Sequence, residues 1–349
     1  MKAIFDIGHP AHVHLFRNTI LNLQKRDWQI KIIARPKEIT LDLLRAYGFD
    51  YEMLPHYDGL MNKTIGLLRI ELGYWKIARA FHPDVIISMS SVYSAHVSRL
   101  IGKPNIAFGD TPASKGSLFN FVQHVLFAPF ANIICTPDVF PYRFSTSRHV
   151  TYNGYHELAY LHPKHFKPDP FILKEVGLTE KDSFIVMRFA AWDAVHDLGQ
   201  RGFKDIRERI EFVKKMENFA RVFVTSEVAI PELKKNELTL PPEKIHSLLA
   251  YATLYIGEGA TMASEAGVLG VPWIFVYTQR LPYLDDQERN FNLGYTVNDA
   301  SKALEIAAKI FQIENLKIQW QKKRQKLLKD KIDVCDFITN LIIASSREN

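Results

Sequence analysis

Residues 254–276, LYIGEGATMASEAGVLGVPWIFV, decide the fold of this chain. The apolar run Leu254–Ile256 is typical of a buried strand, and Trp273–Val276 is a second run of the same kind. Ala260–Val268 is rich in residues that favour a helix, which Gly270 is expected to stop. The stretch therefore predicts a strand, a short glycine turn, a helix and a second strand.

The glycine turn is a candidate anion site. Gly257 and Gly259 are expected to adopt backbone angles that a side chain would forbid. A strand, such a turn and a helix start bring unpaired N–H groups together at the positive end of the helix dipole, where a phosphate fits. Glu265 follows about one and a half helical turns later, where a carboxylate would accept sugar hydroxyls. A nucleotide is the expected ligand, although such turns are also common without one.

Length and composition narrow the class of protein. The chain has 349 residues, enough for two domains, and is 47% hydrophobic and 23% charged. No apolar run approaches the roughly 20 residues of a membrane helix, and the N-terminus lacks the pattern of a signal peptide. The two cysteines have no metal-binding spacing, which predicts a reduced, cytoplasmic setting. A net charge of +6 favours anionic partners, but the charges are spread out, so nucleic acid is not expected.

Apolar runs alternate with helical segments through both halves of the chain. This alternation predicts βαβ units, hence an α/β fold with parallel sheets and helices on both faces. Ligands of such sheets bind beyond the carboxyl ends of the strands, so the residues just after each strand are the informative ones. The strands expected before the central stretch are Lys2–Ile7, Gln29–Ala34, Asp84–Ser88, Asn105–Phe108, Ala131–Cys135, His149–Tyr152, Ser183–Phe189 and Arg221–Thr225.

Three histidines, His9, His12 and His14, follow the first expected strand. A zinc site would need a further ligand at tetrahedral geometry, and the spacing matches no standard pattern, so no metal is predicted. A histidine at a helix N-terminus has a lowered proton affinity and can act as a neutral base near neutral pH. The alternative is that one or two of these side chains cap the helix or contact a phosphate.

Residues 117–131, SLFNFVQHVLFAPFA, are rich in aromatic side chains. A core helix is the simplest interpretation. The alternative is an amphipathic surface that meets a lipid-linked acceptor at a membrane, although the segment lacks the lysines usual in such a surface.

Two polar residues of the second half are further candidates. Arg188 could bind a phosphate through two hydrogen bonds, or could form a structural ion pair with an aspartate. His246 begins the helix that precedes the central stretch, and it could cap that helix or face the ligand.

GEGATMASEAGVLGVP, residues 257–272, resembles the donor-site signature of GT-B glycosyltransferases, especially the lipid-linked N-acetylglucosaminyltransferases of peptidoglycan synthesis. It is also similar to the corresponding segment of the non-hydrolysing UDP-N-acetylglucosamine 2-epimerases. Together with NGYHE (153–157) and RFAAWDAVHD (188–197), it resembles the domain-of-unknown-function 354 family, a GT-B-like group. The resemblance covers nearly the whole chain. It implies two Rossmann-like domains whose parallel sheets face an interdomain cleft.

The resemblance implies catalytic roles in the first half. A histidine of the first loop contacts the acceptor or acts as base in many GT-B enzymes, which favours His12 and then His14. Asp110 follows a strand where the epimerases carry a carboxylate, although it could instead simply form a turn. The expected catalytic residues are therefore His12, Asp110 and His14.

The resemblance implies binding roles in the second half. The glutamate at the Glu265 position holds the ribose in those families, and the turn before it faces the pyrophosphate. The end of the strand at 221–225 lies near the nucleotide base, which makes the residues after it candidate contacts. The expected nucleotide-sugar-binding residues are Arg188, Ser226, Glu227, His246, Gly257, Gly259, Ala260, Thr261, Met262 and Glu265.

These observations predict three parts: an acceptor domain at 1–155, a nucleotide-sugar domain at 156–331, and a terminal helix at 332–349 that packs back on the first domain. The expected activity is metal-independent transfer of a sugar from a nucleotide-diphosphate donor, with UDP expected, to a glycan or lipid-linked acceptor, without a cofactor. The alternatives are an epimerase-like isomerase and a non-enzymatic nucleotide-sugar binding protein. The expected location is the cytoplasm, with peripheral contact at the inner face of the membrane as an option.

Overall fold

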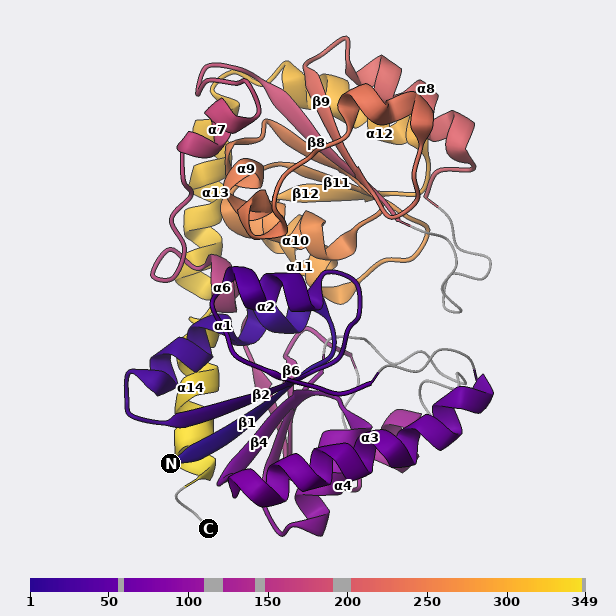
Figure 1. The fold of residues 1–349 in the computed structure, drawn as a ribbon. Coiled ribbons are helices and arrows are strands. Elements are labelled where there is room, and N and C mark those ends of the chain that lie inside the picture. Colours follow the sequence, from indigo (N-terminus) through magenta and orange to yellow (C-terminus); the bar gives the residue numbers. More distant parts are fainter. Residues whose placement is uncertain (56–59, 110–121, 142–147, 191–201, 347–349) are drawn as a thin grey trace. The chain divides into compact units, whose positions relative to one another are not determined.

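A computed structural model describes residues 1–55, 60–109, 122–141, 148–190 and 202–346 of the chain (Figure 1). The chain forms two compact units. The first contains Met1–Tyr160 and Ile332–Asn349, and the second contains Leu161–Lys331. Each unit has its own parallel sheet and its own hydrophobic core.

The first unit is built on a seven-stranded sheet in the order β3-β2-β1-β4-β5-β6-β7, with every pair parallel. Its central strands are continuous apolar runs because helices cover both of their faces. The strands are β1 (Lys2–Ile7), β2 (Gln29–Ala34), β3 (Glu52–Met53), β4 (Val85–Met89), β5 (Asn105–Phe108), β6 (Ile133–Pro137) and β7 (His149–Tyr152).

The helices of the first unit lie against this sheet. Helix α3 packs on α4, and the terminal helix α14 packs on α1, where Asn22 donates to the Cys335 sulfur at 3.4 Å. Of the aromatic segment at 117–131, the structure describes only the part from residue 122, which begins with a short π-helix. The elements are α1 (Pro10–Gln24), α2 (Thr40–Ala46), α3 (Leu60–Phe81), α4 (Val92–Leu100), η1 (Val122–Phe127), α6 (Leu158–Leu161) and α14 (Val334–Ser345).

The second unit is built on a five-stranded parallel sheet in the order β12-β11-β10-β8-β9. Its strands are β8 (Phe184–Phe189), β9 (Arg221–Ser226), β10 (Leu254–Gly257), β11 (Trp273–Val276) and β12 (Gly294–Val297). Its helices are α7 (Phe171–Glu175), α8 (Ile206–Met216), η3 (Pro231–Asn236), η4 (Pro242–Lys244), α9 (Ile245–Tyr251), α10 (Ala260–Leu269), α11 (Pro282–Phe291), α12 (Ala300–Phe311) and α13 (Leu316–Asp330).

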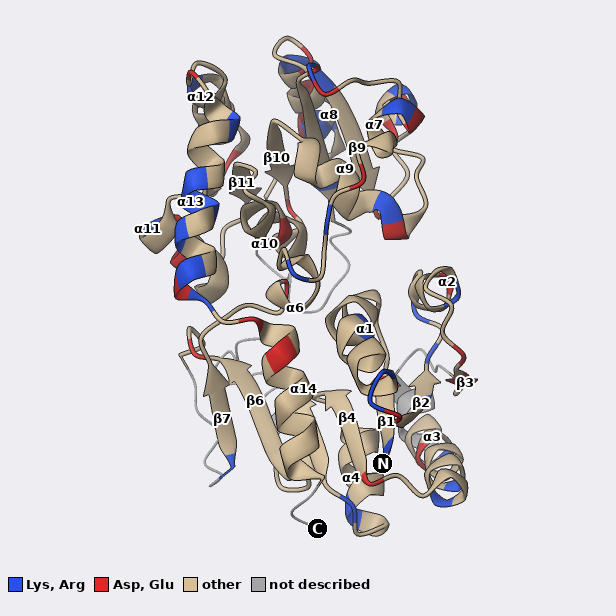
Figure 2. Ribbon diagram, turned by 90° about the vertical axis from the view of Figure 1, so that its left-hand side faces the viewer, with Lys and Arg blue, Asp and Glu red and all other residues tan. Residues whose placement is uncertain are grey.

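Helix α13 carries most of its lysines on its solvent side, and they appear as blue bands along the helix in Figure 2. Its buried residues are Trp320 and Leu327, which attach it to the rest of the second unit. Within the described part of the chain, no helix combines the length and the apolar composition needed to cross a membrane.

The predicted α/β class with parallel sheets is confirmed, and so is the strand, helix and strand order of the central stretch. Gly270 ends α10 with φ of 78°, a left-handed conformation that favours glycine. Two short edge strands, β3 and β12, escaped the sequence analysis because each has only two to four residues and little apolar character.

Each sheet has one point where the strand order reverses direction. In the first unit this point lies between β1 and β4, where Asp6 is in register with Ser88. In the second unit it lies between β8 and β10, where Arg188 is in register with Gly257. Ligands of open parallel sheets bind outside the carboxyl ends of the strands at such points, so the two reversals define where to look for functional side chains.

Candidate functional site

The reversal point of the second unit brings the end of β8 against the glycine turn after β10. A Cβ atom on Gly257 would lie 2.3 Å from the Arg188 carbonyl oxygen, so only glycine fits there. The expected reason for this glycine was wrong: neither Gly257 nor Gly259 has a positive φ, and Gly259 is extended, with φ of −85°. Close approach of two strand ends, rather than an unusual backbone angle, requires the small residue.

The N-terminus of α10 is open at this point. Its N-cap is Gly259, which has no side chain to accept from the first turn. Thr261 is exposed, and Gly259 and Ala260 are partly exposed, whereas Met262 turns into the core. The Tyr255 hydroxyl donates to the Gly259 carbonyl at 2.8 Å and so fixes the start of the helix. The first-turn N–H groups, which have no partner within the helix, therefore lie at a partly exposed, positive end of a ten-residue helix.

Glu265 lies on the same helix face as Thr261, one turn further in. Its side chain is 7% exposed, and Oε1 lies 2.9 Å from Nε2 of His246 on α9. The edge of the His246 ring meets Phe166. The start of α9 has no side-chain cap, so the capping alternative for His246 is wrong. Its side chain contacts Glu265 instead, and its role in ligand binding stays a prediction.

Arg188 and Glu227 form an ion pair beside the turn, with Nη2 to Oε1 at 2.7 Å. Both remain partly exposed, at 30% and 43% of the side chain. The pairing agrees with the structural alternative for Arg188, although the partner is a glutamate rather than an aspartate. Ser226 is exposed at the end of β9, and its hydroxyl accepts the Val228 N–H at 3.3 Å.

Glu258, in the glycine turn between β10 and α10, forms a buried ion pair with Arg209 that was not predicted from the sequence. Glu258 Oε2 lies 2.5 Å from Arg209 Nη2 of α8, and both side chains are at most 2% exposed. The Phe203 amide donates to the other carboxylate oxygen at 3.0 Å. The sequence does hold a sign of this pair. Arg209 shares the apolar face of α8 with Phe212 and Val213 by helical spacing, and a charge on such a face needs a buried partner.

A second buried ion pair lies at the reversal point of the first unit. Arg35 Nη1 lies 2.8 Å from Asp6 Oδ1, and the Ser91 hydroxyl donates to Asp6 Oδ2 at 2.5 Å. Ser91 is also the N-cap of α4, where its hydroxyl accepts the Ser94 N–H at 3.4 Å. The sequence did not lead us to predict a role for Asp6. An acidic residue inside an apolar strand nevertheless indicates a buried partner, as Arg209 does on the apolar face of α8.

The three histidines after β1 have different environments. His9 is the N-cap of α1, with Nδ1 accepting from the Ala11 N–H at 3.2 Å, so the capping alternative holds for it. His14 is 8% exposed and stacks on Tyr160, with its Nδ1 3.4 Å from the Tyr47 hydroxyl. His12 is half-buried at the front of α1, and its Nδ1 accepts from the Gly8 N–H at 3.2 Å. Only His12 combines partial exposure with a place at the reversal point that is not a helix cap.

Some predicted residues cannot be placed. Asp110 lies outside the described residues, and so do residues 191–197 of the run 188–197. The catalytic role predicted for Asp110 therefore stays a prediction.

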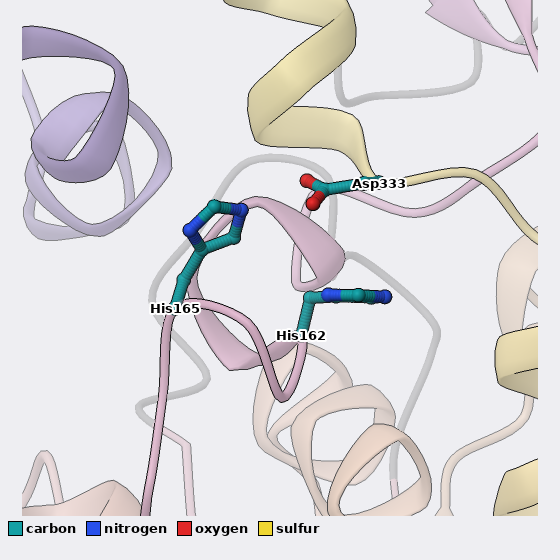
Figure 3. Close-up of side chains that lie close together, drawn as sticks. All are labelled: His162, His165 and Asp333. Carbon is teal, nitrogen blue, oxygen red and sulfur yellow. The ribbon is translucent and has the colours of Figure 1, made fainter. Parts of the chain in front are cut away.

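Two further histidines occupy a turn of the second unit. His162 and His165 are labelled in Figure 3, and the His165 amide donates to the His162 carbonyl at 2.8 Å. The Lys164 amide donates to His162 Nδ1 at 3.3 Å. Asp333, also labelled there, belongs to the first unit, where it caps α14 by accepting the Asp336 N–H at 3.2 Å. The backbone contacts of the two histidines and of Asp333 organise their local turns.

Sequence comparison identifies relatives of the chain. A family model described as "Protein of unknown function (DUF354)" matches residues 1–344. The uncharacterized protein MJ0665 of Methanocaldococcus jannaschii is 25% identical in an alignment 300 residues long that covers 81% of this chain and 85% of that protein.

Solved structures with the same fold include enzymes of two kinds. A putative UDP-N-acetylglucosamine 2-epimerase from Listeria monocytogenes has a TM-score of 0.68 and 13% identity, over 99% of this chain and 95% of the other. The glycosyltransferase SsfS6 of Streptomyces sp. SF2575, complexed with thymidine diphosphate, has a TM-score of 0.62 and 13% identity, over 99% of both chains. The predicted GT-B fold, with two Rossmann-like domains, is thereby confirmed.

Proposed function

Because the chain belongs to the DUF354 family and has the GT-B fold, we propose that it is a glycosyltransferase. It moves a sugar from a nucleotide-diphosphate donor, a UDP-sugar, to a glycan or lipid-linked acceptor, and it does so without a metal ion. Family and fold alone do not specify the reaction, so the proposal rests on the chemistry at the reversal point of the second unit.

One observation carries the proposal: the N-terminus of α10 has no side-chain cap, and one turn further along the helix His246 holds the carboxylate of Glu265. The N–H groups of residues 260–262, at the start of α10, suit a diphosphate. Hydrogen-bond donors and the positive end of the helix dipole both lie at this N-terminus, where they attract a negative charge. Glu265 lies one turn below Thr261 on the same face, and His246 fixes its orientation. A nucleotide joins a diphosphate to a ribose. Its diphosphate would bind the N–H groups of α10, and its ribose hydroxyls would donate to the Glu265 carboxylate.

Arg188 is the cation of this site. Its exposed ion pair with Glu227 is of a kind that contributes little to stability, so the guanidinium can exchange that partner for a phosphate at small cost. Arginine binds phosphate oxygens through two parallel hydrogen bonds. Ser226 ends the neighbouring strand β9 and Glu227 follows it, and these two residues are the proposed contacts to the nucleoside.

In the reaction, an acceptor hydroxyl oxygen forms a bond to the anomeric carbon. The bond from that carbon to the diphosphate breaks, and its electron pair leaves with the diphosphate. The N–H groups of α10 and Arg188 stabilise the charge that develops there, as preorganised donors do. The acceptor's proton passes to a base, for which the sequence offers His12 and Asp110.

An epimerase-like isomerase is the second candidate. The exposed carboxylate of Glu227, beside the diphosphate site, could take part in removing and returning a proton. Such an enzyme would eliminate UDP and add it back at one site, and it would need no acceptor. A non-enzymatic nucleotide-sugar binding protein would use the same donor site without turnover.

One experiment separates the three candidates. The full chain is incubated with UDP-, GDP-, dTDP- and CMP-sugars, with and without glycan and lipid-linked acceptors, and release of the nucleotide is followed. Acceptor-dependent release supports the transferase. Conversion of one sugar into another without acceptor supports the isomerase, and binding without turnover supports the sensor.

We also propose that the protein works in the cytoplasm, at the inner face of the membrane if its acceptor is lipid-linked, and does not bind nucleic acid. Its two cysteines are both free and buried, which suits a reducing compartment. Val125 and Phe130, from the aromatic segment at 117–131, are 47% and 37% exposed. They are candidate membrane contacts, and flotation of the protein with anionic vesicles tests this.

A further inference from the structure

The ring of His12 is fixed by the backbone of the loop that carries it. The Gly8 N–H, at the end of β1, donates to His12 Nδ1 at 3.2 Å. The His12 amide in turn donates to the His9 carbonyl at 3.0 Å, so both the ring and its backbone are held. His12 is half-buried, and among the described residues Gly8 is the hydrogen-bond partner of its ring.

This contact assigns the tautomer. A ring nitrogen that accepts a hydrogen bond cannot carry a proton, so the neutral ring must carry its proton on Nε2. The other tautomer would set Nδ1–H against the Gly8 N–H, two donors face to face, and would leave a backbone N–H unpaired. His9 provides a comparison: its Nδ1 accepts from Ala11, and its Nε2 lies 3.5 Å from Glu38 Oε1, as expected of an N–H donor.

The surroundings of His12 keep the ring neutral. Burial lowers the pKa of His12 well below its ordinary value, and repulsion from neighbouring ionisable groups, the Arg35 guanidinium among them, lowers it further. A neutral ring with a proton on Nε2 has no free lone pair with which to remove a proton. Its remaining capacity is to donate one hydrogen bond.

We propose that His12 is an acceptor-binding residue that donates its Nε2–H to an oxygen of the acceptor substrate, and that it is not the base of the reaction. The oxygen is one that does not itself attack, such as a neighbouring hydroxyl, carboxylate or phosphate oxygen, because a hydrogen bond to the attacking oxygen would lower its nucleophilicity. The proposal rests on the proposed transferase function for the identity of the ligand, but its assignment of the proton does not.

The assignment is tested first without any substrate. The full chain is labelled with ¹⁵N-histidine, and the two ring nitrogens of His12 are read from long-range ¹H–¹⁵N spectra at neutral pH. The His12 signals are identified by their loss in the His12→Gln variant. A protonated Nε2 with a bare Nδ1 is the expected result. A protonated Nδ1, or a ring that is an imidazolium at neutral pH, overturns the proposal.

A pair of variants then separates donor from base. In His12→Gln the side-chain amide N–H reaches the position of Nε2, whereas in His12→Asn the amide group reaches only the position of Nδ1. Neither amide can act as a base. With the acceptor that gives nucleotide release in the panel above, a donor role predicts that Gln retains activity at least tenfold better than Asn. It also predicts that the loss in Asn appears mainly as a higher KM for the acceptor.

Equal loss of kcat in both variants, with KM unchanged, contradicts the donor role. Circular dichroism confirms that both variants are folded. If the wild-type chain releases no nucleotide with any acceptor, the transferase proposal fails, and the NMR experiment still decides the tautomer of His12. The two failures are therefore distinguishable.

Discussion

His246 Nε2 lies 2.9 Å from Glu265 Oε1, with both side chains at most 7% exposed. The two residues come from different helices, α9 and α10, and meet beneath the open tip of α10. A carboxylate buried to this degree needs hydrogen-bond donors, and the imidazole supplies one while fixing the direction of the group. The pair gives the candidate ribose contact a defined orientation before any ligand arrives.

Removing the carboxylate should weaken nucleotide binding. Glu265→Ala is expected to reduce the affinity for UDP by about 1.5–3 kcal/mol, the usual contribution of a hydrogen bond to a charged group. Isothermal titration calorimetry with UDP measures this. Glu305→Ala, at an exposed position of α12, is the control and should bind as the wild type does. Unchanged affinity in Glu265→Ala would remove this residue from the site.

The His246–Glu265 contact should appear as coupling between the two positions. If His246 acts only by orienting Glu265, then His246→Ala weakens UDP binding, but adds little once Glu265 is already alanine. Residues in direct contact show coupling energies of about 0.5–3 kcal/mol in a double-mutant cycle. Calorimetry on the two single variants and the double variant gives this number. Strictly additive losses would show that His246 meets the nucleotide independently.

Breaking the ion pair under the glycine turn should destabilise the second unit. Glu258→Gln leaves Arg209 as an uncompensated buried charge, and removing one partner of a buried pair typically costs about 3–5 kcal/mol. Urea unfolding followed by tryptophan fluorescence reports the free energy of unfolding. Glu305→Gln, which breaks an exposed ion pair with Lys302, is the matched control and should unfold like the wild type. A Glu258→Gln variant as stable as that control would contradict the structural role.

A methyl group at Gly257 should not fit. The Cβ of Gly257→Ala would collide with the backbone of Arg188, and overpacking of this kind costs about 1–3 kcal/mol. Gly73→Ala in α3 is the control: its Cβ would meet only the flexible end of Leu54, and alanine favours a helix. Thermal unfolding should show a lower midpoint for Gly257→Ala alone. Equal midpoints would mean that the β8–β10 spacing adjusts freely.

His12 should make stability depend on pH in a known direction. Because its pKa in the folded chain lies below the ordinary value of 6.5, the unfolded chain binds this proton first as the pH falls. The contribution of His12 is thus flat above pH 6.5 and becomes unfavourable below it. The wild type should lose stability relative to His12→Gln between pH 7.5 and 5.5, as measured by urea unfolding at several pH values. A difference that stays constant over this range would mean that the pKa is not lowered.

Much of the fold could be predicted from local patterns. Apolar runs of strand length, helical periodicity and a stop signal such as Gly270 act within a few residues, so strand and helix positions could be assigned without knowing their neighbours. The reason for Gly257 could not, because it depends on the distance between two strands that are far apart in the chain. The short edge strands were missed because pairing, rather than composition, makes them strands.

The sequence by itself determined the α/β class, the central strand, helix and strand motif, and the helix tip that could bind a phosphate, since each follows from short-range propensity and backbone geometry. Only the tertiary structure decided which charges meet: Glu258 with Arg209 across 49 residues, and Glu265 with His246 across 19. A buried charge must find a partner, but the partner is set by sheet order and helix packing, which no local pattern encodes.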